Sequence, residues 1–251
     1  MANKSLIYIN GDSYSVLTRH KVYSDFLNDS FDCDVVNDAH YGSSNERIFR
    51  STVTSLEKYK KQYDKIFVIV GFSFIARCEM SIMTDVFDKN INEDLIVREA
   101  RKSTEKEGID VDYTFTVTSE WARKTNISDV KERYKYMLMA QDPFCYHISF
   151  INQLAMFSTY LKSITPDYFL FQAAYNKHMA EDDEHLNLFQ EQMGAYSIIQ
   201  NDPNNRFYDF KLRDYCEENN IETAEMGHMY ENGHKIFSEY LGKILTRSQW
   251  T

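Results

Sequence analysis

A serine near the start of the chain and two histidines near its end are of the right types for nucleophilic chemistry. Ser13 follows Gly11 and Asp12 directly after an apolar run, and His228 and His234 lie close together in the C-terminal part of the chain. A serine hydroxyl is a weak nucleophile that needs an adjacent base. An imidazole with its usual pKa of ~6.5 can be neutral and accept that proton. Ser13 and His228 are therefore candidates for a nucleophile and its general base.

Each of the two histidines has an acidic residue three positions upstream. Glu225 precedes His228, and Glu231 precedes His234. A carboxylate in this place can fix the imidazole tautomer and stabilise the imidazolium. We rank Glu225 with His228 first, because we expect His234 to lie inside the last amphipathic helix, where it would pack or cap. Glu231 and His234 remain the alternative dyad.

Short apolar runs predict the strands that would position these side chains. Four runs read as buried strands, at residues 6–9, 33–36, 66–70 and 168–171, and a weaker fifth lies at 221–224. Apolar stripes at helical spacing separate them, the clearest at 48–63, 148–161 and 236–245. Continuous apolar runs that alternate with helices suit a parallel sheet covered on both faces. We therefore predict a three-layer α/β/α, doubly wound (flavodoxin-like) fold with a five-stranded parallel sheet.

One stretch departs from this alternation. Residues 79–165 carry mixed charges and helical patterning, and within them only 114–118 alternates like a hairpin or edge strand. We interpret 79–165 as a mostly helical insertion in a single domain that spans 1–251. As an insertion between core strands, it is a candidate for a lid or for an oligomer contact.

The candidate residues follow the predicted strands in order. Ligands of open α/β sheets bind outside the carboxyl ends of the strands. Ser13 follows the first strand, Gly42 lies in the loop after the second, and Ser73 follows the third in Gly71-Phe72-Ser73. A glycine in a loop that opens a helix lets its N–H point at an anion. We therefore expect these residues at one edge of the sheet.

Together these segments resemble the SGNH, or GDSL-type, esterase and lipase family. Gly11-Asp12-Ser13 matches the first block of that family, and Gly42 within Gly-Ser-Ser-Asn matches the second. The last block of the family, Asp-x-x-His-Pro-Asn-x-x-Gly-His, matches at Glu225, His228, Gly233 and His234. The resemblance covers the core of the chain in the right order and leaves the insertion unmatched.

The resemblance implies a serine ester hydrolase. Ser13 would be the nucleophile, His228 the base and Glu225 the acid. The N–H groups of Ser13 and Gly42, with the hydroxyl of Ser73, would form the oxyanion hole. Two residues depart from the family pattern, because Ser73 stands for the usual asparagine and Glu225 for the usual aspartate.

The resemblance also implies what the protein binds. The chemistry requires no metal and no organic cofactor, and the substrate would be a small-molecule or carbohydrate ester. The short motifs look like those of phage- or bacterium-encoded members, whose substrates are often acetylated sugars, which suggests a carbohydrate O-deacetylase.

Other interpretations stay open beside this one. Ser13 could be a turn or capping serine, and Gly42 a structural turn glycine. The chain could be a non-catalytic SGNH-like binding or structural protein that uses the insertion as an interface. A nucleotide-binding function would need a phosphate-cradling Gly-rich loop, which the sequence lacks. We interpret the acidic run between His178 and His185 as a solvated loop, with a metal site as the less favoured alternative. Arg77 and Glu79 follow the third strand, and we expect them to form structural ion pairs, with each other or with the insertion.

Composition limits the remaining classes. The chain has 251 residues, 28 Lys+Arg and 38 Asp+Glu, for a net charge of −10. This charge argues against binding to nucleic acid or to an anionic membrane surface. No apolar run approaches the ~18–20 residues of a transmembrane helix, and the N-terminus lacks the pattern of a signal peptide. Four scattered cysteines without a CxxC suggest free thiols. We expect a cytoplasmic protein, or a virion-associated one if a phage encodes it.

Overall fold

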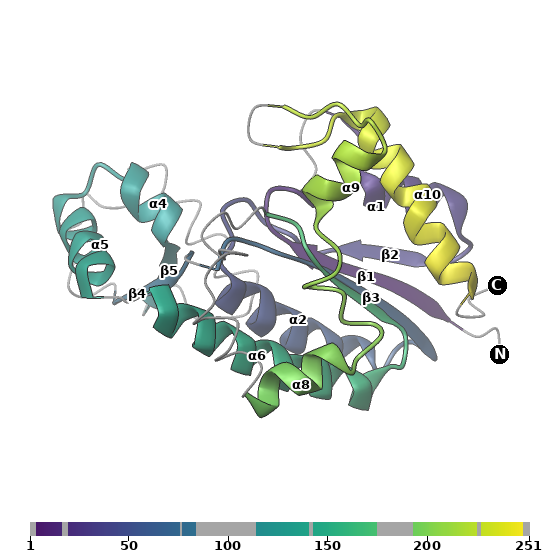
Figure 1. Ribbon diagram of the computed structural model, residues 1–251, viewed down its shortest axis with the longest axis horizontal. Coiled ribbons are helices and arrows are strands. Elements are labelled where there is room, and N and C mark those ends of the chain that lie inside the picture. Colours follow the sequence, from purple (N-terminus) through teal and green to yellow (C-terminus); the bar gives the residue numbers. More distant parts are fainter. Residues whose placement is uncertain are drawn as a thin grey trace.

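A parallel β-sheet forms the centre of the molecule. The computed structural model describes residues 4–16, 20–75, 77–83, 114–140, 143–174, 193–224 and 227–247. The sheet contains β1 (Ser5–Gly11), β2 (Asp34–Asn37), β3 (Lys65–Phe72) and β6 (Tyr168–Gln172), in the order β2-β1-β3-β6 (Figure 1). All neighbouring pairs are parallel. The predicted α/β class with a parallel sheet is therefore confirmed.

Helices pack against both faces of this sheet. One face carries α1 (Tyr23–Ser30), α9 (Leu212–Glu218) and α10 (Glu231–Arg247), and the other carries α2 (Asn45–Tyr59), α6 (Pro143–Ile164) and α8 (Gly194–Gln200) (Figure 1). Successive side chains of a strand point to opposite faces. Accordingly Ile7 and Ile9 pack with Phe237 of α10, whereas Leu6 and Tyr8 pack with Ile48 of α2. One apolar cluster therefore lies on each face of the sheet and packs it against the helices.

The expected strand at 221–224 is not part of the sheet. That segment makes one isolated antiparallel bridge, between Thr223 and Met229. The segment 204–211 flanks β6 instead, through parallel bridges from Leu170 to Asn205 and from Gln172 to Lys211. It carries the polar residues Asn204, Asn205, Arg206 and Asp209, so it lacks the apolar run that would mark a strand in the sequence.

Two short strands accompany the helices in the described part of the region after β3. β4 (Glu79–Met83) and β5 (Thr114–Thr118) form a two-stranded antiparallel sheet, and α4 (Ser119–Lys124) and α5 (Ser128–Ala140) follow. The alternation at 114–118 thus marks a strand. These elements lie on the side of the molecule where the core strands end (Figure 1).

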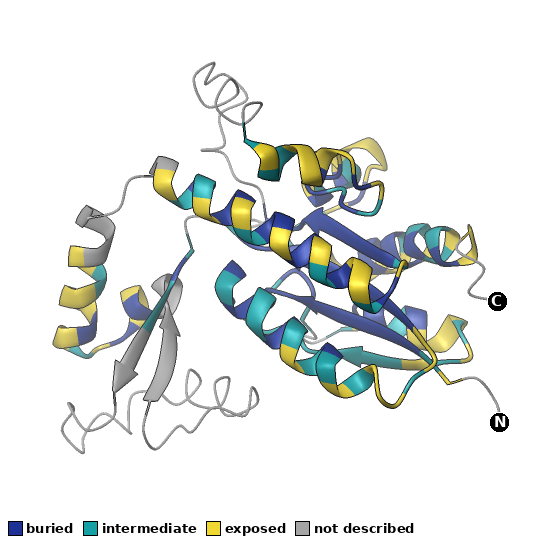
Figure 2. Ribbon diagram, turned by 90° about the horizontal axis from the view of Figure 1, so that it is seen from below, coloured by how far each residue is buried: buried dark blue, intermediate teal, exposed yellow. Residues whose placement is uncertain are grey.

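The long helix α6 belongs to the core, although the interpretation of the sequence placed it in the insertion. Its residues Ile151, Leu154 and Leu161 are fully buried against the sheet. Figure 2 shows α6 lying along the sheet, with exposed residues on its outer side. Its apolar stripe was recognised, but the boundary at 165 was too far along the chain, because a helical pattern alone does not say which surface it covers.

Two smaller findings concern the rest of the described chain. None of its helices is both long and apolar enough to cross a membrane. The structure describes all four cysteines, and none of them forms a disulfide.

Candidate active site

A tight turn after β1 presents Ser13 at the carboxyl edge of the sheet. The N–H of Tyr14 donates to Asp12 Oδ1 at 3.1 Å, and the N–H of Ser15 donates to the Asp12 carbonyl at 3.0 Å. Gly11 is required before this turn, because a Cβ there would lie 2.7 Å from Ser15 Oγ and 2.9 Å from the carbonyl oxygen of Gly71. The turn leaves Ser13 half-buried between the buried Asp12 and Tyr14.

His228 meets Ser13 from the segment that precedes α10. Its Nε2 lies 2.9 Å from Ser13 Oγ, within hydrogen-bond distance. The backbone carbonyl of His228 accepts from the N–H of Ala224 at 2.8 Å, and its ring stacks on Tyr14 with centroids 4.3 Å apart. The contact expected between Ser13 and His228 is therefore present, although the two residues come from opposite ends of the chain.

The environment of His228 favours the neutral imidazole. Burial lowers its pKa below the usual value of 6.5, and the positive charge of Arg77 lowers it further, while the Asp12 carboxylate acts in the opposite direction. A neutral ring can accept the Ser13 proton at Nε2 if Nδ1 carries the other proton. Glu225, the acid expected to hold Nδ1, lies outside the described residues, so its role stays a prediction.

Below the nucleophile, Asp12 is fully buried in a polar network. Its Oδ2 accepts the Ser73 hydroxyl at 2.7 Å and an N–H of Arg77 Nη1 at 3.2 Å. Burial raises the pKa of Asp12, and the Arg77 charge, the Ser73 hydroxyl and the Tyr14 N–H oppose that rise. The network thus offsets part of the cost of burying this carboxylate beside Ser13.

This network corrects the role expected for Ser73. The Ser73 side chain is fully buried, and its hydroxyl donates to Asp12 while accepting from Arg77 Nη1 at 2.8 Å. A hydroxyl has one proton to donate. That proton is used by Asp12, so Ser73 does not supply an oxyanion-hole donor in this arrangement.

The loop that carries Gly42 lies against the nucleophile turn. The N–H of His40 donates to the Gly11 carbonyl at 3.2 Å, and Arg77 Nη1 donates to the Ser43 carbonyl at 3.2 Å. Gly42 has a φ of +69°, a left-handed conformation that costs a residue with a side chain about 1–2 kcal/mol. The structure thus brings the Gly42 loop to the edge where Ser13 stands.

The start of α2 fixes this loop to the end of β3. The Ser44 side chain caps the helix by accepting from the N–H of Arg47 at 3.2 Å. Next to it, Asn45 Oδ1 accepts from the N–H of Ser73 at 2.8 Å, and its Nδ2 donates to the Ser73 carbonyl at 3.3 Å. The segments after β2 and β3 are therefore bonded to each other as well as to the Ser13 turn.

Ser13 and His228 open into a pocket of about 240 Å³. Among the described residues, the other lining side chains carry no carboxylate, lysine or arginine, and they are Val16, His20, Tyr41, Ala224, Met229, Tyr230 and His234. Tyr41 and Tyr230 are also partly exposed to solvent. No described residue of β4, β5, α4 or α5 lines this pocket, so the lid expected from the insertion is not seen among them.

The alternative dyad does not form. His234 lies inside α10, is 5% exposed, and its Nδ1 has no hydrogen-bond partner among the described residues, whereas Glu231 is exposed at the start of the helix. Burial lowers the pKa of His234 to about 4, with smaller contributions from His20 and His228. His234 therefore packs in α10 as expected, and it is neutral at physiological pH.

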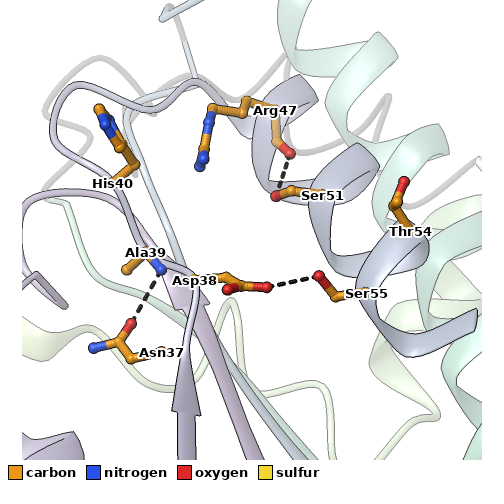
Figure 3. Close-up of a pocket in the computed structure, with 8 residues that line it drawn as sticks. All are labelled: Asn37, Asp38, Ala39, His40, Arg47, Ser51, Thr54 and Ser55. Carbon is orange, nitrogen blue, oxygen red and sulfur yellow. Dashed lines mark hydrogen bonds between the residues drawn. The ribbon is translucent and has the colours of Figure 1, made fainter. Parts of the chain in front are cut away.

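A second pocket, of about 90 Å³, lies between the loop after β2 and α2 (Figure 3). Its polar groups bond to one another: Ser55 donates to Asp38 at 2.6 Å, and the N–H of Ala39 donates to Asn37 Oδ1 at 3.0 Å. Neither Ser13 nor His228 lines it. It is separate from the site at Ser13.

Arg77 is the site residue that sequence reasoning missed. Both Arg77 and Glu79 form ion pairs, as expected, but in the described part of the chain neither pairs with the other or with the insertion. Glu79 pairs with Arg50 at 2.6 Å, and Arg77 pairs with Asp12, beside the nucleophile, at 3.2 Å. The available signal was its position just past the third strand, on the edge that carries Ser13. The run from His178 to His185, considered as a metal site, lies outside the described residues.

A scan against protein-family models and a search of curated proteins found no match to the chain.

Proposed function

We propose that the protein is a serine ester hydrolase of the SGNH or GDSL type. The observation that carries this proposal is the 2.9 Å contact between Ser13 Oγ and His228 Nε2, at the carboxyl edge of a parallel sheet. Nucleophile and base within hydrogen-bond distance are the core of this chemistry. The pocket on which both residues open supplies space for a substrate.

The proposed reaction has two halves. Ser13 Oγ attacks the ester carbonyl carbon as its proton passes to His228 Nε2, and the tetrahedral intermediate collapses when His228 returns that proton to the leaving alcohol. Water then attacks the acyl-serine, again with His228 as base, and releases the carboxylic acid and free Ser13. Glu225 would orient the imidazole and stabilise the imidazolium.

The oxyanion would be held by backbone N–H groups. The N–H of Ser13 and the N–H of Gly42 are the proposed donors, and one such donor is typically worth about 2.7–4 kcal/mol. The hydrogen bond from His40 to the Gly11 carbonyl supports this assignment, because it fixes the Gly42 loop next to the Ser13 turn. These steps call on side chains and backbone alone, without a metal or organic cofactor.

The proposal includes two features of the fold, its three layers and a fifth strand. In a three-layer, flavodoxin-like fold with a five-stranded sheet, segment 204–211 would take the fifth strand position, beside β6.

The proposed substrate is a small-molecule or carbohydrate ester, such as an O-acetylated sugar. The partly exposed Tyr41 and Tyr230 would flank it at the mouth of the pocket.

A fluorophosphonate probe tests the proposal directly. The probe phosphonylates activated serines, so we expect stoichiometric labelling of the wild-type protein and none of Ser13→Ala. Ser15→Ala is the matched control, because Ser15 is buried and bonded to Tyr23 at 2.8 Å and should not be a target. Labelling that persists in Ser13→Ala would end the assignment.

A non-catalytic binding or structural protein of similar fold is the second candidate. It is favoured by Ser73, whose hydroxyl bonds to Asp12 and leaves the proposed oxyanion hole with backbone donors. Such a protein would use the region after β3 as an interface, in a complex or a homo-oligomer. It would leave the probe unreacted, which distinguishes it from the hydrolase.

A further inference from the structure

The guanidinium of Arg77 joins the three segments that surround the nucleophile. Its Nη1 lies 3.2 Å from Asp12 Oδ2, 3.2 Å from the Ser43 carbonyl oxygen and 2.8 Å from Ser73 Oγ. Asp12 and Ser43 are the direct chain neighbours of the proposed nucleophile and of the proposed oxyanion-hole glycine. A single nitrogen atom therefore bonds to the segments after β1, β2 and β3.

Arg77 is itself held in place. Its backbone N–H donates to the Phe74 carbonyl at 3.0 Å, and its guanidinium carbon lies 5.0 Å from the centroid of the Phe74 ring. The side chain is 12% exposed. A guanidinium fixed on both sides loses little conformational freedom when it forms these bonds, so it can act as a rigid connector.

Arg77 also balances the negative charge of Asp12. The carboxylate of Asp12 is fully buried, and a buried charge is costly unless it is paired and hydrogen-bonded. Arg77 supplies the cation, and Ser73 Oγ and the Tyr14 N–H supply further donors. Without Arg77, Asp12 would be a buried carboxylate next to Ser13 with neutral donors alone.

We infer that Arg77 is a positioning residue, which sets the separation between the Ser13 turn and the Gly42 loop. This inference rests on the proposed function. Arg77 acts through Asp12 and Ser43, and a shift of either segment would separate the two N–H groups that have to meet one oxyanion. Such groups act on the transition state more than on the bound ester, so loss of Arg77 lowers kcat and leaves KM nearly unchanged.

Two substitutions of Arg77 test the inference. Arg77→Met keeps an unbranched apolar stem and removes the charge and the donors, and we expect a loss of ~100-fold in kcat, the size of losing an oxyanion-hole donor. Arg77→Lys should stay within ~10-fold of wild type, because all three acceptors converge on one nitrogen and an ammonium carries three N–H donors. The rate of fluorophosphonate labelling should follow the same order. An Arg77→Lys variant as slow as Arg77→Met would overturn the inference.

Arg50→Met is the matched control. Arg50 forms an ion pair with Glu79 at 2.6 Å, away from Ser13, so the same chemical change should leave kcat within ~2-fold of wild type. If Arg77→Met does not fold, the double variant Asp12→Asn/Arg77→Met removes both buried charges together. Once folded, it should remain as slow as expected for Arg77→Met, because the bonds from Arg77 to Ser43 and Ser73 are still missing.

The possible failures are distinguishable. If the wild-type protein takes up no probe, the proposed function and the role of Arg77 fall together. If the wild type is labelled at Ser13, and the folded Arg77 variants without the charge are labelled equally fast, the role of Arg77 alone is overturned.

Discussion

The ring of Tyr14 stacks on the imidazole of His228, with centroids 4.3 Å apart and planes 12° apart. Tyr14 follows the proposed nucleophile directly, so the same turn that presents Ser13 also orients its base. Burial and the Asp12 charge raise the pKa of the Tyr14 phenol to about 12, and the ring is therefore neutral throughout the working pH range.

Removing this ring should loosen His228. We expect Tyr14→Leu to lower kcat by about 10-fold, because the imidazole loses its stacking contact and samples orientations away from Ser13. Tyr14→Phe keeps the ring and serves as the control, with kcat close to wild type. Steady-state kinetics on a small ester measures both. Equal losses in the two variants would assign the effect to the hydroxyl and not to the stacked ring.

Ser13 and His228 should behave as one functional unit. Ser13→Ala and His228→Ala should each abolish nearly all esterase activity. The double variant should be little worse than either, because the nucleophile and the base that accepts its proton contribute to catalysis only together. The measurement is kcat/KM of the three variants on the same ester. Losses that multiply in the double variant would mean that the two residues act independently.

The site could be located from the sequence because parallel strands end at a common edge. The apolar run before Gly11 predicted β1, and the rule that ligands bind at carboxyl ends placed Ser13 there. His228 was harder to place, since it stands before a helix and not after a strand. Its spacing from Glu225 and His234 supplied the signal.

What the sequence could not predict depends on contacts that leave no periodic pattern. Segment 204–211 flanks β6 through a few backbone hydrogen bonds and carries polar residues such as Asn205, which is buried and donates to Ser158 at 2.8 Å. Arg77, in the segment after β3, pairs with Asp12, in the turn after β1, and residue type and spacing do not predict such a contact. The surface that α6 covers is likewise a tertiary property, which its apolar stripe does not specify.

Ser73→Asn distinguishes the observed network from the one that the family resemblance implies. The Ser73 side chain is fully buried between Asp12 and Arg77, so a longer amide would push these two groups apart. We expect a loss of at least ~10-fold in kcat/KM. Ser73→Ala, the control, removes the hydrogen bond to Asp12 and the one from Arg77, and it should cost about 1–3 kcal/mol of stability. Higher activity in Ser73→Asn would instead place this position at the oxyanion hole.

Activity should rise with pH as His228 loses its proton. The base form is the active one, and burial lowers the pKa of His228, so the midpoint of kcat/KM should lie below the usual 6.5. A pH profile of kcat/KM for a neutral ester measures this midpoint in the free enzyme. A Ser13-dependent activity that is half-maximal above pH 7 would contradict the buried, neutral imidazole.

The stability of the fold should fall in acid as His234 becomes protonated. Burial lowers the pKa of His234 to about 4 in the folded protein, against 6.5 when the chain is unfolded, so the unfolded state binds more protons between these values. The contribution of a neutral His234 is fully present above pH 6.5 and is lost as the pH falls towards 4, by about 3 kcal/mol in total. Urea unfolding at several pH values measures this loss. Burial also lowers the pKa of His147 to about 4, so His234→Gln should remove about half of the decline between pH 6.5 and 4. His20→Gln, which changes a neighbouring ring 6.0 Å from His234, should leave most of the decline in place. An unchanged slope in His234→Gln would show that His234 does not carry the acid sensitivity of the fold.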